Sequence, residues 1–196
     1  MAHADLYDVT VDTSAITGTV GSLDFNFNPG PLLSQDASAQ ILNFTTDGTL
    51  AGSPVLTGDV SGALPSTLTF DNGTGFNDYF DGFTFGSTLS FQLSPYGPAV
   101  SSPDGFSTSG SAFGFSMFSD PGGTVPVLTT DTTDGFAFTT SINLDGTTTV
   151  TGIRRKPVWF RSRAPFQNRA AHPVGGCARV CGFAGIATAS KTGVIS

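Results

Sequence analysis

The chain has 196 residues, of which 38% are hydrophobic and only 12% are charged, and its formal net charge is −7. This length and apolar content allow one domain with a buried core and exclude a wholly disordered chain. All 15 acidic residues are aspartates between Asp5 and Asp145, whereas all 8 basic residues lie between Arg154 and Lys191. The acidic part has no cation with which to neutralise phosphates, which excludes nucleic-acid binding there.

The N-terminus reads Ala2-His3-Ala4, a small-residue pattern typical of a signal-peptidase site. We expect residues 1–4 to be the remnant of a signal peptide, so that the chain as written lacks an intact one. The alternative is that the pattern is a coincidence in a protein rich in small residues.

Residues 6–150 alternate apolar and small polar residues with a period of two, which is typical of half-buried β-strands. The helix formers Glu, Lys and Arg are absent from this part of the chain. The apolar alternations cover residues 7–11, 23–27, 42–44, 68–70, 83–85, 89–93, 113–117, 136–138 and 142–144.

Asp-Gly and Asn-Gly pairs separate these strands and are typical of tight turns. They occur at 47–48, 72–73, 81–82, 104–105, 134–135 and 145–146. About ten short strands joined in this way predict an all-β fold, an antiparallel β-sandwich of jelly-roll type, with a closed barrel as the alternative.

The change in composition places a domain boundary near Gly152. We therefore expect a β-sandwich domain over 5–152 and a disordered tail over 153–196, since the Arg, Pro, Ala and Gly residues of the tail follow no period. No apolar run in the chain reaches the roughly 18 residues that span a membrane, so we expect no membrane span in it.

Several strings of the body resemble a known family. They are YDVTVDTS at 7–14, NDYFDGFTFG at 77–86, FGFS at 113–116 and LTTD at 128–131. Together they are similar to exported bacterial proteins of the PEP-CTERM class, and the resemblance covers about residues 5–150. It implies a secreted β-rich body at the cell surface or in the extracellular matrix, an association with exopolysaccharide and biofilm, and a C-terminal anchor that exosortase recognises in an intact homologue.

This chain departs from that family after Gly152, where neither the Val-Pro-Glu-Pro motif nor an apolar helix follows. Codon degeneracy nevertheless permits Val-Pro-Glu-Pro over residues 165–171 in a shifted reading frame. We therefore expect the segment 153–196 to be an out-of-frame form of the anchor.

Catalytic patterns are missing from the body. The two histidines are His3 and His172, outside the strand region, and no Gly-x-Ser-x-Gly elbow occurs. A glycosidase needs two carboxyl groups, but most aspartates here occupy turn positions. We therefore expect no enzymatic activity and no catalytic residues.

Calcium is the one cofactor that the aspartates favour, because Ca²⁺ takes six to eight oxygen ligands. The spacing matches no known calcium loop, so plain Asp-Gly and Asn-Gly turns remain the alternative. The calcium candidates are Asp71, Asn77, Asp78 and Asp81.

Two functions follow from these patterns. The first is a secreted or cell-surface structural or matrix-associated protein without catalytic activity. The second is an exopolysaccharide-binding module, assisted by calcium, with exopolysaccharide or other surface proteins as partners. The Phe-x-Phe pairs decide between them: we expect them to form the core, whereas a sugar-binding module would expose an aromatic side chain.

Overall fold

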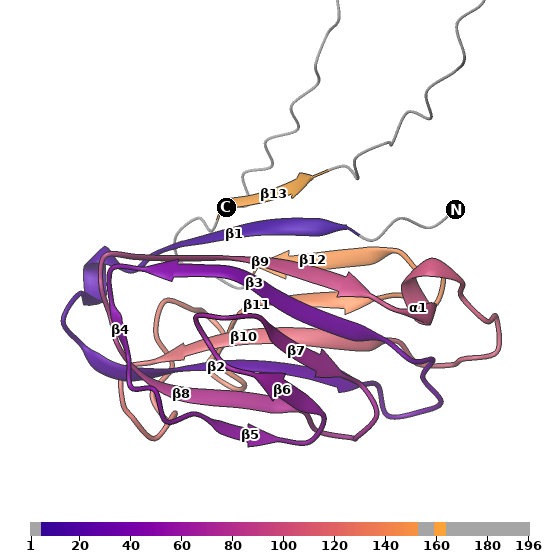
Figure 1. Cartoon of the computed structure of the whole chain (residues 1–196), viewed down its shortest axis with the longest axis horizontal. Helices are drawn as coiled ribbons and strands as arrows, with labels where there is room; N and C mark the ends of the chain where they lie inside the picture. Colours follow the sequence, from indigo (N-terminus) through magenta and orange to yellow (C-terminus); the bar gives the residue numbers. More distant parts are fainter. Residues whose placement is uncertain (1–4, 153–158, 164–196) are drawn as a thin grey trace, which may run out of the picture.

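Alternating apolar and polar residues form short strands that pair in two antiparallel sheets, packed face to face (Figure 1). The structure is a computed structural model, and it describes residues 5–152 and 159–163. This architecture confirms the predicted all-β sandwich. The predicted signal-peptide remnant at 1–4 lies outside the described residues.

The first sheet has the strand order β13-β1-β9-β3-β7-β6, and the second has the order β12-β11-β10-β2-β8-β4, with β5 also paired to β8. The strands of the first sheet are β13 (Trp159–Arg163), β1 (Leu6–Asp12), β9 (Thr88–Tyr96), β3 (Ser38–Thr46), β7 (Leu68–Asp71) and β6 (Val60–Gly62). Those of the second are β12 (Thr148–Gly152), β11 (Phe136–Ile142), β10 (Ser111–Phe118), β2 (Val20–Pro29), β8 (Asp78–Thr84), β4 (Thr49–Leu50) and β5 (Val55–Thr57). Two short helical turns, Ser14–Ile16 and α1 (Pro98–Ser101), complete the fold.

The core between the sheets is built mainly from phenylalanine. The ring of Phe25 in the second sheet lies 4.7 Å from that of Phe115 and 5.4 Å from that of Phe91 in the first sheet, measured between centroids. Tilted and edge-on pairs of this kind add about 0.5–1.5 kcal/mol each beyond the area they bury. The prediction that the Phe-x-Phe pairs form the core is therefore confirmed for most of them.

Strand β3 corrects one predicted alternation. The sequence placed Leu42 and Phe44 on the same face, but the structure buries Ile41 and Phe44 and leaves Leu42 partly exposed. The cause is a bulge at Asn43, whose φ of 52° interrupts the pairing with β9. The extra residue changes the face to which the following side chains point.

The pair Asp81-Gly82 also corrects a prediction, because it lies in the middle of β8 and not in a turn. Gly82 faces outward beneath Ala51, which approaches it closely. Asp81 faces inward and is 1% exposed. Leu144, predicted on the same face as Ile142, is 50% exposed in the turn after β11.

Strand β13 is the main departure from the sequence prediction. Residues 153–196 were expected to contain no packed element, yet 159–163 pair antiparallel with β1 at the edge of the first sheet (Figure 1). The edge of β1 offers unpaired backbone groups, and five residues suffice to bond to them whatever their side-chain pattern. The remainder of that predicted tail lies outside the described residues.

One long connection, residues 119–135, folds back over the outer face of the second sheet. Val127 donates its backbone N–H to Met117, and the Ser22 hydroxyl donates to the carbonyl of Asp120, at 2.9 and 3.0 Å. As a result Ser116 and Phe118, on the outer face of β10, are buried. No helix in the described part of the chain is long and apolar enough to cross a membrane.

Candidate functional site

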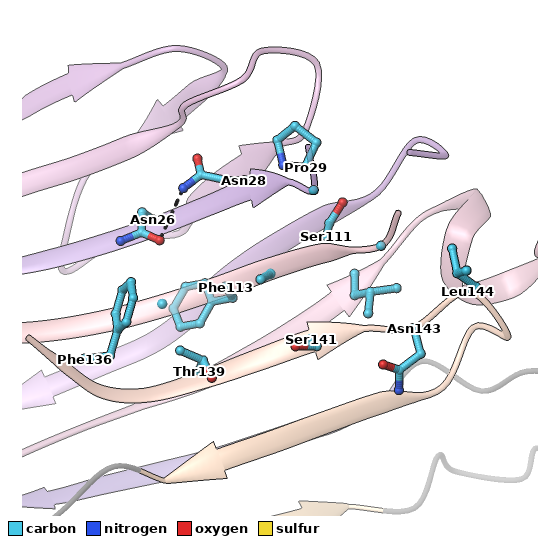
Figure 2. Close-up of a pocket in the computed structure, with 15 residues that line it drawn as sticks. Asn26, Asn28, Pro29, Ser111, Phe113, Phe136, Thr139, Ser141, Asn143 and Leu144 are labelled. Atoms are coloured by element: carbon cyan, nitrogen blue, oxygen red, sulfur yellow. Dashed lines mark hydrogen bonds between the residues drawn. The ribbon is translucent and has the colours of Figure 1, made fainter. Parts of the chain in front are cut away.

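A groove runs along the outer face of the second sheet, with β10 as its floor and β2 and β11 as its walls (Figure 2). It encloses about 420 Å³. The strand register explains its shape. Ala112 on β10 lies between Asn28 on β2 and Ser141 on β11, and in the next row Gly114 lies between Asn26 and Thr139. Larger side chains therefore flank a central strand whose outward side chains are minimal.

Phe136 forms one end of this groove, where its partly exposed ring lies against the backbone of Gly114. A Cβ atom at position 114 would be 2.3 Å from Cε1 of Phe136 and 2.9 Å from Oδ1 of Asn26. The 2.3 Å distance means that the ring or the strand would have to move to admit a Cβ atom, so glycine at position 114 permits this ring position. The connection 119–135 covers the sheet beyond this point, so the groove is closed beyond Phe136.

The other end is open, toward Pro29, Gly30 and Leu144. Figure 2 shows Asn26 and Asn28 along one wall, and Phe136, Thr139 and Ser141 along the other. Asn143 stands at the open end, where its amide nitrogen donates to Thr149 at 2.9 Å.

The polar groups of the groove retain much of their hydrogen-bonding capacity. Nδ2 of Asn28 is 3.5 Å from Oδ1 of Asn26, and Nδ2 of Asn26 is 3.5 Å from Oδ1 of Asp24, which is long for a hydrogen bond. Within the described part of the chain, the hydroxyls of Thr139 and Ser141 have no hydrogen-bond partner. These amides and hydroxyls can therefore bond to a ligand without breaking strong internal bonds.

A pair of carboxyl groups lies beside the groove on the same face. Asp24 is one row beyond Asn26 on β2, and Asp78 stands on β8 opposite Asn26. Burial, followed by the hydrogen bond and the charge of Asp24, raises the pKa of Asp78 to about 8. Burial also raises the pKa of Asp24, while its hydrogen bonds with Asp78 and Asn26 act in the opposite direction. Near neutral pH, Asp78 therefore keeps a proton and donates it to the Asp24 carboxylate.

This pair is not arranged for hydrolysis of a glycosidic bond. Glycosidases hold their two carboxyl groups about 5 Å or more apart, so that a sugar carbon or a water fits between them. Asp24 and Asp78 are instead hydrogen-bonded to each other directly. No histidine, cysteine, lysine or glutamate is present anywhere in residues 5–152 to supply another acid, base or nucleophile.

The structure does not bring the four calcium candidates together. Asp71 lies at the end of β7 in the first sheet, where the Ser38 hydroxyl donates to it. Asn77 is buried, and its amide group is already bonded to the backbone of two neighbouring segments. Asp78 points to the outer face of β8 and Asp81 to the inner face, because they are three residues apart on one strand. Among the residues that the structure describes, no three His, Cys, Asp or Glu side chains converge in a metal-binding group.

Sequence reasoning missed the groove altogether. Its residues are small and polar, and locally they look like the ordinary solvent-facing positions of strands. A faint signal was present in the outward positions Ala112 and Gly114 of β10, which are smaller than the Asn, Thr and Ser residues on other strands. Only the register of β2, β10 and β11 shows that these small residues form the floor of one groove.

Comparisons with family models, with curated proteins and with solved structures gave no match to this chain.

Proposed function

We propose that this chain is a non-catalytic, cell-surface or matrix-associated protein of an exported bacterial class, and that it holds polysaccharide in the groove of its second sheet. The observation that carries the proposal is the composition of the groove: amides, free hydroxyls and one exposed aromatic face along an open channel. Amides and hydroxyls can both donate to and accept from sugar hydroxyls, and an aromatic face packs against the C–H face of a sugar ring.

The proposed lack of catalysis is supported by the chemistry of the body. Its only titratable side chains are aspartates and tyrosines. Asp24 and Asp78, the acids nearest the groove, are hydrogen-bonded to each other. A binding function needs none of these groups to react. Calcium assistance has no support from the positions of the four candidate residues, so it forms no part of the proposal.

Export to the cell surface is supported by composition and by the resemblance of residues 5–150 to the PEP-CTERM class. A body free of cysteine and lysine, and rich in Thr, Ser, Gly and Asp, is typical of exported bacterial surface proteins. A matrix protein of that class would meet exopolysaccharide as its nearest neighbour.

The test is co-sedimentation of the full-length chain with a panel of insoluble or bead-coupled polysaccharides of neutral, anionic and cationic types. We expect at least one of them to pull down the chain, and the Ala112→Leu variant to lose that binding because a larger side chain fills the valley between Asn28 and Ser141. Ala112 is solvent-exposed, so the substitution leaves the core intact. The proposal fails if no polysaccharide binds, or if Ala112→Leu binds as well as the original chain.

A purely structural role in the matrix is the second candidate. The burial of eleven of the 18 phenylalanines at 7% exposure or less favours it, because a structural module needs only a stable core. This candidate predicts no saturable binding to any member of the polysaccharide panel, so the same experiment separates the two functions.

A further inference from the structure

We infer that the groove selects an uncharged polysaccharide, with one sugar ring packed on Phe136 and the following sugars hydrogen-bonded between β2 and β11. This inference rests on the proposed function and names the class of ligand. It follows from three features of the groove: its charge, its dimensions and the state of its polar groups.

The charge around the groove argues against an anionic ligand, and no carboxylate lines the groove to pair with a cationic one. None of the side chains that line it is ionisable. Residues 5–152 carry 15 aspartates and neither Lys nor Arg, so a uronate or sulfate group would find no cation to pair with and would meet a net negative field. Burying an unpaired charge is costly, and an anionic glycan is therefore disfavoured.

The dimensions of the groove fit a single glycan chain. The walls stand on strands two positions apart in the sheet, so the backbones of β2 and β11 are about 10 Å from each other. The open floor rises no higher than the methyl group of Ala112, and at Gly114 the ring of Phe136 covers the floor. One row of flat sugar rings can lie along β10, entering at the open end beside Leu144 and ending at Phe136.

The aromatic end of the groove is fixed in place before any ligand arrives. Phe136 lies against Gly114 on one side and is partly exposed on the other. A preset ring loses little entropy when a sugar packs on it, which favours binding. The ring has no polar tip, so it recognises the apolar face of a sugar and not a charged substituent.

Hydrogen-bonding groups of both kinds line the path from that end. Thr139 and Ser141 offer hydroxyls without internal partners, and Asn26 and Asn28 offer amide N–H groups held only by 3.5 Å contacts. Each hydroxyl group of a neutral sugar can both donate and accept a hydrogen bond, so groups on both walls can bond to it.

The test is affinity electrophoresis of the full-length chain in gels that contain a neutral glucan or galactomannan, an anionic alginate, or a cationic chitosan, each at low and at high salt. We expect retardation by a neutral glycan that is independent of salt. Phe136→Ala should weaken it about tenfold or more, because the packed ring is lost. Ser141→Ala should weaken it without affecting folding, because this hydroxyl has no internal partner.

Phe106→Ala is the matched control, since Phe106 is 81% exposed and lies outside the groove. This variant should bind as the original chain does. Chitosan should retard the chain only at low salt and equally in Ala112→Leu, because that attraction is long-range and screened. Salt-resistant binding of alginate or chitosan that Ala112→Leu abolishes, with no neutral glycan bound, would overturn the uncharged class and keep the proposed function. If no polysaccharide binds under any of these conditions, both the uncharged class of ligand and the proposed function are wrong.

Discussion

Asp81 on β8 lies directly opposite Leu23 on β2, and both side chains point into the core between the sheets. Asp81 is 1% exposed, and neither of its carboxylate oxygens has a hydrogen-bond partner among the described residues. The nearby hydroxyl of Tyr79 accepts the backbone N–H of Leu64 at 3.3 Å. Burial, which is the largest cause, and the nearby Asp81 carboxylate raise the pKa of Tyr79 to about 12, while the backbone bond from Leu64 acts in the opposite direction.

We expect Asp81→Asn to stabilise the protein by about 1–3 kcal/mol, because it replaces a buried carboxyl group that has no hydrogen-bond partner among the described residues with an amide of nearly the same volume that cannot ionise. Urea denaturation measures this effect. Asp36→Asn is the control, since Asp36 is exposed and its charge is solvated. Equal or lower stability of Asp81→Asn relative to that control would mean that the carboxylate is satisfied in the folded protein.

Asp81 also illustrates which part of the fold the sequence could predict. The period of two identified most strands, because each strand buries one face and the alternation is local. An Asp-Gly pair is a turn signal in most contexts, and nothing local distinguishes Asp81-Gly82 from true turns such as Asp145-Gly146, whose glycine has a φ of 80°. The strand at 78–84 is fixed by its pairing with β2, which is a long-range interaction.

The candidate site was still less predictable, and Phe136 shows why. The alternation Phe136-x-Phe138 placed both rings on one face. A bulge in the pairing of β10 with β11 sets Phe138 opposite the inward Phe115, but Phe136 opposite the outward Ser116. One extra residue in a strand moves a side chain from the core to the surface, and no sequence pattern within β11 predicts this bulge.

The close approach of Gly114 to Phe136 gives a second prediction. Gly114→Ala places a Cβ within 2.3 Å of the ring, so the ring or the strand must move. We expect a loss of about 1–3 kcal/mol, together with loss of polysaccharide binding. Thermal unfolding provides the measurement. Gly75→Ala serves as the control, since no atom lies within 4 Å of the Cβ that it would add. A Gly114→Ala variant as stable as Gly75→Ala would show that the groove wall is free to adjust.

The pair Asp24–Asp78 predicts how stability depends on pH. The pKa of Asp78 is about 8 in the folded protein, well above the ordinary value of 3.8, so the folded state holds a proton that the unfolded state has released. The stability from this proton is fully present below about pH 4 and is lost as the pH rises through about 8. We therefore expect the urea midpoint to fall between pH 4 and pH 8.

The variant Asp78→Asn should flatten that decline, because its amide cannot ionise. A weaker dependence of stability on pH should remain, because burial also raises the pKa of Asp24. Asp47→Asn is the control: hydrogen bonds from Ser87 and Thr88 lower the pKa of Asp47 to about 2, so its contribution is lost only as the pH falls below about 4. An unchanged slope between pH 4 and pH 8 in Asp78→Asn would contradict the shared-proton arrangement.

The separation of the calcium candidates predicts that millimolar Ca²⁺ leaves the melting temperature unchanged. A ligand that binds only the folded state raises the melting temperature, and Asp78 and Asp81 cannot share an ion from opposite faces of β8. Differential scanning calorimetry of the full-length chain in Ca²⁺ and in chelator provides the test. A saturable rise in Ca²⁺ would reveal a site formed by other oxygen atoms.

The pairing of β13 with β1 predicts that residues 159–163 support the fold. Asp8 lies opposite Arg161 in this ladder, and β9 already occupies the other edge of β1. A chain that ends at Gly152 leaves the outer edge of β1 unpaired, whereas a chain that ends at Arg163 keeps it covered. We expect the shorter chain to melt lower by about 2–4 °C for each kcal/mol of lost pairing, and to associate through its open edge at high concentration. Calorimetry and light scattering on the two truncated chains test this directly. If both melt at the same temperature and stay monomeric, the strand contributes nothing to stability, and the sandwich is complete at the boundary near Gly152 that the composition predicts.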